Sequence, residues 1–181
     1  MPRLQFAGVA VTTMALLSFV PLVPQPEAAL ATVQQPACTI EGTAHSDTLR
    51  GTAGDDVICG HEGSDLIRGL AGDDIILGGK GIDTASYSSA RHSVYVYLTS
   101  RVAYGQGTDG VYVENVVGSL NDDDLRGTNA INSIDGGAGD DVLFGGGGDD
   151  FLTGGDGADY CDGGYGKRDT AAACEEQVNV P

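Results

Sequence analysis

The chain has 181 residues, with 26 Asp and Glu against 9 Lys and Arg, and therefore a formal net charge of −17. Such a negative balance disfavours nucleic acids and anionic membrane surfaces as partners and favours cations. Glycine accounts for 29 residues. Because glycine tolerates backbone conformations that other residues avoid, this content points to many tight loops.

An apolar run occupies the N-terminus. It extends over residues 6–23, follows Arg3, and is succeeded at residues 29–31 by Ala-Leu-Ala, a small-x-small cleavage pattern. The pattern predicts a signal peptide at 1–31 and export of the remaining chain. A membrane anchor is the alternative interpretation, although the run is short and three prolines lie in it or just beyond it.

After a short expected N-terminal cap, 32–41, a nine-residue frame repeats over 42–86 and again over 118–162. Position one is glycine in all ten units, position six is aspartate in nine, and position eight is apolar throughout, with Ala85 and Cys161 the least typical members. The position-six residues are Asp47, Asp56, Asp65, Asp74, Asp83, Asp123, Asn132, Asp141, Asp150 and Asp159. A fixed short period of this kind indicates a stacked repeat architecture.

The unit divides into a loop and a strand. Glycines at positions one, two and four suit a loop that turns its carbonyl groups inward, and oxygen atoms are the ligands that Ca²⁺ prefers. In the last three positions side chains alternate between faces, so position eight points inward. Two units then complete one coil of 18 residues, and successive loops lie on opposite edges.

The frame resembles the repeat-in-toxin, or haemolysin-type, calcium-binding nonapeptide G-G-x-G-x-D-x-U-x, and about half of the chain carries the match. The resemblance implies an all-β fold, a parallel β-roll or β-solenoid, in which loops bind Ca²⁺ between stacked turns. Loops one coil apart would share ions, about six in total, since each ion needs several oxygens. Asn132 offers a neutral oxygen, so its site should be weaker.

The expected metal ligands are the ten position-six side chains together with backbone carbonyl groups of the loop glycines. Those glycines are Gly51, Gly54, Gly60, Gly63, Gly69, Gly72, Gly136, Gly139, Gly145 and Gly148. The position-five residues Asp55, Asp73, Asp122, Asp140 and Asp149 are expected to face solvent. We expect one edge of the roll to carry Asp47, Asp65 and Asp83 in the first block, and the other to carry Asp56 and Asp74.

Residues 87–117 between the blocks predict a β-rich insertion. Alternation around 94–98 predicts one strand, 105–110 a glycine-rich turn, and 111–117 a second strand. A structural role, extending one roll or joining two, is the main interpretation. Its tyrosines form a ligand-binding face in the alternative interpretation.

Four cysteines, an even number, fit disulfide bonds in an oxidising compartment. Of three connectivities the local one is favoured, Cys38 with Cys59 and Cys161 with Cys174, because a bridge at each end would pin the caps of a solenoid. A zinc site is the rival interpretation, but the chain has no C-x-x-C pair and its three histidines are scattered.

The tail 163–181 is expected to be a C-terminal cap. It begins like another unit but has Arg168 in the place of the aspartate, with Asp169 displaced by one residue. No H-E-x-x-H, G-x-S-x-G or phosphate-loop pattern occurs, so the sequence predicts no enzyme.

Taken together, the pattern predicts a secreted calcium-binding protein that folds when its loops bind ions, with no nucleic-acid partner and no membrane insertion after signal cleavage. Without calcium the chain is expected to be disordered, since about one buried side chain per nine residues cannot offset the backbone entropy. A calcium-stiffened adhesin or cell-surface interaction protein is the second hypothesis, and a secreted hydrolase the third.

Overall fold

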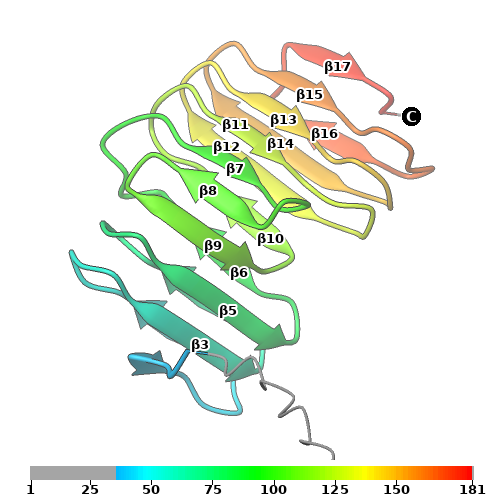
Figure 1. Cartoon of the computed structure of the whole chain (residues 1–181). Coiled ribbons are helices and arrows are strands. Elements are labelled where there is room, and N and C mark those ends of the chain that lie inside the picture. The colour runs from blue at the N-terminus through cyan, green and yellow to red at the C-terminus, as the bar shows by residue number, and fades with distance from the viewer. Residues whose placement is uncertain (1–35, 181) are drawn as a thin grey trace, which may run out of the picture. The chain divides into compact units, whose positions relative to one another are not determined.

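The computed structural model describes residues 36–180, and the regular structure in this part of the chain is β-strand (Figure 1). The predicted signal peptide, 1–31, lies outside the described residues. Among residues 36–180 there is no helix long and apolar enough to cross a membrane.

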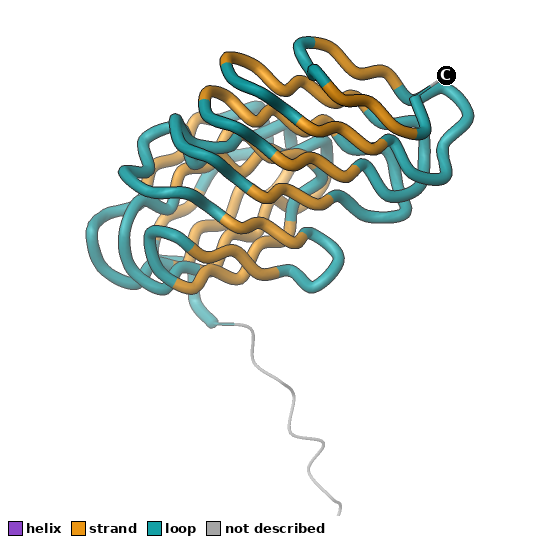
Figure 2. Tube along the Cα trace, turned by 90° about the horizontal axis from the view of Figure 1, so that it is seen from above, coloured by secondary structure: helices purple, strands orange, loops and turns teal. Residues whose placement is uncertain are grey.

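The strands form two sheets that lie face to face, with loops along both edges (Figure 2). In spatial order the ten-stranded sheet contains β1 (Ile40–Glu41), β3 (Val57–Glu62), β5 (Ile75–Lys80), β9 (Thr108–Tyr112), β8 (Val102–Tyr104), β7 (Tyr95–Tyr97), β11 (Asp124–Arg126), β13 (Val142–Phe144), β15 (Tyr160–Asp162) and β17 (Glu176–Val178). The seven-stranded sheet contains β16 (Thr170–Ala172), β14 (Phe151–Asp156), β12 (Ser133–Ala138), β10 (Asn115–Val117), β6 (Thr84–Ser86), β4 (Leu66–Arg68) and β2 (Thr48–Arg50). The prediction of an all-β parallel roll is confirmed.

The register of the strands follows the repeat. Ile58 pairs with Ile76 in one sheet and Leu49 with Ile67 in the other, so partners lie 18 residues apart, which confirms two units per coil. Position-eight side chains consequently stack between the sheets and form a single apolar core. Even Ala85 and Cys161, the least typical members, have no exposed surface.

The insertion fills the roll rather than separating two rolls. β9 continues the ten-stranded sheet beside β5, β7 continues it beside β11, and β8 closes the gap by running antiparallel to both. β10 bridges β6 and β12 in the other sheet. The first predicted strand matches β7, but the second is two strands, β9 and β10, because the chain crosses from one sheet to the other between them. β8 was not expected from the sequence.

Candidate metal sites

Each position-six residue is the last residue of a loop, and a strand begins at the next residue. Along each edge of the roll these side chains stack into a column, which we call a ladder, and each residue of a ladder is a rung. The ladder beside the seven-stranded sheet contains Asp47, Asp65, Asp83, Glu114, Asn132, Asp150 and Asp169. The ladder beside the ten-stranded sheet contains Asp56, Asp74 and Asp109, then, beyond the insertion, Asp123, Asp141, Asp159 and Glu175. The structure therefore confirms the predicted division of the loops between the two edges of the roll.

Hydrogen bonds connect the rungs. The backbone N–H of Asp47 donates to Oδ1 of Asp65 at 2.8 Å, and the N–H of Asp65 donates to Oδ1 of Asp83 at 2.9 Å. On the other edge the N–H of Asp123 donates to Oδ1 of Asp141 at 2.8 Å. One carboxylate oxygen of Asp65, Asp83 and Asp141 thus holds the coil before it.

The second carboxylate oxygen is buried and unpartnered in half of the rungs. In the described part of the chain, seven buried side-chain oxygens have no hydrogen-bond partner, and all belong to ladder aspartates: the Oδ2 atoms of Asp65, Asp74, Asp83, Asp141, Asp150, Asp159 and Asp169. A buried polar atom without a partner costs free energy comparable to a lost hydrogen bond. Because seven such atoms occupy equivalent positions along the two ladders, they indicate a ligand that binds at each of these positions rather than a local packing fault.

Position two decides which rungs are unpartnered. Where it is Thr or Ser, as in Thr52 and Ser119, its N–H and hydroxyl both donate to the position-six side chain, here Asp56 and Asp123. We call these closed loops, and their position-six residues are Asp47, Asp56, Asp123 and Asn132.

In the remaining loops position two has a positive φ, and its N–H makes no bond to the carboxylate. We call these open loops, and their position-two residues are His61, Leu70, Gly79, Gly137, Gly146, Gly155 and Gly164. His61 and Leu70, with φ of 77° and 79°, occupy a region that residues other than glycine rarely adopt. Such backbone strain is typical of functional sites.

The glycine at position one keeps a small space open beside each unpartnered oxygen. A Cβ atom at Gly136 would meet Oδ2 of Asp141 and lie 2.8 Å from the carbonyl oxygen of Gly154 in the next coil. Three other position-one glycines have the same surroundings: Gly60 beside Asp65, Gly145 beside Asp150 and Gly154 beside Asp159. At Gly69 and Gly78 the nearest atoms all belong to the aspartate of the same loop. A carboxylate oxygen and a carbonyl oxygen therefore line a cradle that only glycine leaves free, and this donor set fits Ca²⁺.

The predicted carbonyl ligands lie in two rows, one formed by position one and one by position four of the loops. At position one, the carbonyl groups of Gly60, Gly69, Gly136 and Gly145 face the open Cα side of the equivalent glycine in the preceding coil, and Gly51 itself lies under Gly69. At position four, the carbonyl groups of Gly54, Gly63, Gly72, Gly139 and Gly148 each face a glycine of the following coil.

Burial raises the pKa values of five open-loop carboxyl groups, those of Asp74, Asp83, Asp141, Asp150 and Asp159. The pKa of Asp141 rises to about 7 and those of Asp74 and Asp150 to about 6, mainly because these groups are removed from water and secondly because other carboxylates lie near them. Asp47 and Asp56 differ, since the N–H groups of Thr43 and Thr52 hold their pKa values below the usual range. The open loops therefore disfavour uncompensated negative charge and favour a cation.

The insertion supplies one further rung to each ladder, Glu114 and Asp109. Oε2 of Glu114 accepts the N–H of Asp83 at 2.9 Å, so the first ladder continues between the blocks. On the opposite edge Asp109 accepts the N–H of Asp74 at 3.1 Å, and its other oxygen accepts the hydroxyl of the buried Tyr87 at 3.1 Å. Asp109 thus ends its ladder with both oxygens bonded.

The position-five aspartates form a second, outer row. Asp55, Asp73, Asp122 and Asp140 are exposed, as expected, and Asp149 is partly buried. Each accepts a backbone N–H from the next coil, for example that of Asp140 by Asp122 at 2.9 Å. These residues add negative potential near the cradles without lining them.

Both disulfides join the residues expected. Cys38 and Cys59 have Cα atoms 5.9 Å apart, and Cys161 and Cys174 have Cα atoms 6.1 Å apart. The first attaches β1 to β3 and the second closes the C-terminal coil. Among residues 36–180, no three His, Cys, Asp or Glu side chains converge in an arrangement that could hold a metal by themselves. The donor set is instead one carboxylate per loop with backbone carbonyl groups.

The model of the RTX calcium-binding nonapeptide repeat matches the chain in four copies, over residues 41–76, 60–85, 117–152 and 139–166. The chain belongs to this family. No curated protein matches the sequence. RTX repeats bind Ca²⁺.

Sequence reasoning missed four rungs: Asp109, Glu114, Asp169 and Glu175. Glu114 had a usable signal, because it precedes Asn132 by one coil of 18 residues. Asp169 follows Asp150 by 19 residues and Glu175 follows Asp159 by 16, so neither obeys the period. Asp109 reaches its place through an antiparallel excursion that no period encodes.

Proposed function

We propose that this chain is an exported RTX protein that binds several Ca²⁺ ions between stacked loops and folds when it does so. The observation that carries the proposal is the row of buried Oδ2 atoms without a partner in the open loops. Beside five of these atoms, those of Asp65, Asp141, Asp150, Asp159 and Asp169, a carbonyl oxygen lies across a space that only glycine leaves open. Carboxylate and carbonyl oxygens at the same point are the ligands that a calcium site requires.

Among the ten predicted side chains, the strongest ligands in this proposal are those of the open loops: Asp65, Asp74, Asp83, Asp141, Asp150 and Asp159. In the closed loops the position-six side chain already accepts hydrogen bonds from Thr or Ser, so an ion there would have to displace these bonds. The residues are Asp47, Asp56, Asp123 and Asn132. They are proposed as weaker ligands, and each is the first position-six residue of its repeat block on one edge of the roll. About six ions, the number expected from the stacked pairs, is retained as a proposal.

Folding on binding follows from the charge of the ladders. Successive rungs bring carboxylates together, and the pKa of Asp83 is raised by burial first and by Glu114 and Asp65 next. Near neutral pH these groups repel one another in the metal-free roll. A bound cation removes that repulsion, and its binding free energy becomes folding free energy. The ordered ladder would then exist only in the loaded protein.

Export is supported by the predicted signal peptide and by the two disulfides, which persist in oxidising compartments. Extracellular calcium modules work with dissociation constants of about 10⁻⁴ to 10⁻³ M, in the range of calcium outside cells. We propose a binding role and no catalytic one.

Asp141 and Asp140 provide a matched test. Asp141 is buried with an unpartnered oxygen, whereas Asp140 is exposed and accepts the N–H of Ala158. Asp141→Asn is expected to weaken calcium binding about tenfold at the adjoining cradles, because the affinity of such sites follows ligand charge. Asp140→Asn should change it little. Calorimetric titration of the chelated mature chain, with far-ultraviolet circular dichroism in parallel, measures binding and folding together.

Equal affinities of the two variants would contradict the assignment of Asp141. An unchanged strand spectrum in chelator and in millimolar calcium would contradict folding on binding, whatever the variants do.

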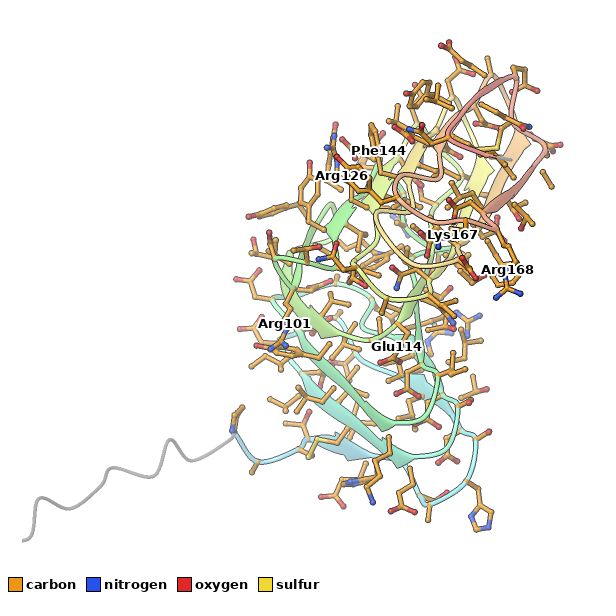
Figure 3. All side chains as sticks on the ribbon, turned by 90° about the vertical axis from the view of Figure 1, so that its right-hand side faces the viewer. Arg101, Glu114, Arg126, Phe144, Lys167 and Arg168 are labelled. Carbon is orange, nitrogen blue, oxygen red and sulfur yellow. A yellow bond between two sulfur atoms is a disulfide. The ribbon has the colours of Figure 1, made fainter. Side chains whose placement is uncertain are left out.

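A second candidate function, a calcium-stiffened interaction protein, is favoured by the outer face of the ten-stranded sheet. Figure 3 shows Arg126 over Phe144, with 4.5 Å between the guanidinium carbon and the ring centre. The guanidinium carbon of Arg126 also lies 5.6 Å from the ring centre of Tyr97. The ring of Phe144 packs against that of Tyr160, with 5.8 Å between the ring centres. Aromatic rings and arginine are the residues most enriched in binding hot spots.

This candidate predicts that the loaded protein binds cells or glycans through that face. Tyr97→Ala is expected to weaken such binding by at least about tenfold, the effect of a hot-spot truncation. Phe151→Ala, on the other sheet and 55% exposed, is the control. Surface plasmon resonance on immobilised glycans or cell extracts in calcium measures both. Equal loss in the two variants would exclude the face as the binding surface.

A further inference from the structure

The loop after β15 departs from the repeat. Gly163–Asp169 has seven residues where the other loops have six, and the family match ends at residue 166. Arg168 occupies the place of the aspartate in the sequence. In the structure it is not a rung of the ladder.

The extra residue is accommodated on the outside of the loop. Arg168 points outward (Figure 3), and its Nη2 atom lies 2.8 Å from Oδ2 of Asp149. The N–H groups of Lys167 and Arg168 both donate to Oδ1 of the same carboxylate, at 3.2 and 3.3 Å. The loop therefore bulges by one residue at its surface and recovers its register before β16.

Asp169 consequently occupies the ladder position. Thr170 pairs with Phe151, which places Asp169 opposite Asp150. The N–H of Asp150 donates to Oδ1 of Asp169 at 2.8 Å, the same bond that joins the regular rungs.

The other oxygen of Asp169 has the features of an open loop. Asp169 is 2% exposed, and its Oδ2 atom is buried without a partner. Gly164, at position two, has a φ of 86°. A Cβ atom at Gly163 would lie 2.8 Å from this oxygen and 2.6 Å from the carbonyl oxygen of Asn179. The chain end thus supplies the carbonyl group that a following coil supplies elsewhere.

We propose that Asp169, with the Asp150 loop and the carbonyl groups of Gly163 and Asn179, holds a further Ca²⁺ ion beyond the family repeats. This inference rests on the proposed function of the regular loops. Gly163 and Asp169 lie inside the ring that Cys161 and Cys174 close, with a sequence separation of 13, so the disulfide holds both ends of the segment that carries these two ligands. The tail is then a binding coil as well as a cap.

The test compares the ion count of the full mature chain with that of Asp169→Asn, by equilibrium dialysis at millimolar calcium and by calorimetry. The variant is expected to bind one ion fewer and to keep the affinities of the others. Asp156→Asn, at an exposed aspartate near the same end, is the control and should keep the full count. The same count in Asp169→Asn as in the wild type overturns the inference.

The outcomes separate the two proposals. A wild-type chain that binds no calcium defeats the proposed function, whereas a wild type that binds ions with an unaltered count in Asp169→Asn defeats only the additional site. If Asp169→Asn does not fold, a crystal structure of the wild type grown in calcium decides. An ion about 2.3 to 2.6 Å from Oδ2 of Asp169 is expected, and a water or an empty space there overturns the site.

Discussion

Acidification from pH 8 to pH 5 is expected to release calcium from the roll, with about a hundredfold loss of affinity at the cradle of Asp141. The pKa of this carboxyl group is raised to about 7 by burial, so at pH 5 about 1% of the metal-free group is ionised. Asp74 and Asp150, with pKa values of about 6, protonate over the same interval. Protons and calcium therefore compete for the same oxygens.

The metal-free chain should respond to pH in the opposite direction. A carboxyl group whose pKa is higher in the folded than in the unfolded state favours folding at low pH, and this contribution is lost as the pH rises through the folded value. For Asp141 the interval runs from about 4, the unfolded value, to about 7. Lowering the pH in chelator is thus expected to restore strand structure, while lowering it in limiting calcium removes bound ions.

Circular dichroism and calcium-electrode titrations between pH 5 and pH 8 measure both slopes. Asp140→Asn, at an exposed position, should retain the wild-type profile of calcium release, and Asp141→Asn should flatten it. Slopes of the same sign with and without calcium would contradict the electrostatic account of the open loops.

Gly136→Ala is expected to abolish calcium binding at one cradle and to destabilise the loaded roll by about 1 to 3 kcal/mol, the usual cost of overpacking. The added methyl group would occupy the space between Oδ2 of Asp141 and the carbonyl group of Gly154. Neither oxygen belongs to a long side chain that could move away. The variant thus removes the site without removing any ligand.

Gly147→Ala is the matched control, at position three of an open loop. Its Cβ atom would lie 3.4 Å or more from the nearest atoms, which belong to Asn129, and the residue is absent from the positive-φ glycines of the described chain. Urea unfolding in saturating calcium should show little loss for Gly147→Ala, and calorimetry should show an unchanged ion count. Comparable losses in both variants would mean that glycine acts through loop flexibility and not through the space at the cradle.

The sequence by itself determined the period of the roll, and the period carried most of the fold with it. Because position-eight residues recur every nine places and two units make a coil, the core, the 18-residue register and the division of loops between two edges all follow from counting. The pairing of the cysteines that the structure contains was favoured by a different argument: Cys38 precedes the repeat and Cys174 follows it, so a bridge at each end would pin the two caps. Because every unit has the same glycine, aspartate and apolar positions, only one way of stacking the units buries all the apolar side chains.

Only the tertiary structure decided where the period fails. Asp169 is out of step by one residue, and its place depends on the outward pairing of Arg168 with Asp149. Asp109 and Glu114 become rungs because the three strands of the insertion fill one sheet while a single strand fills the other. These features arise from contacts between coils, which the repeating pattern of the sequence does not describe.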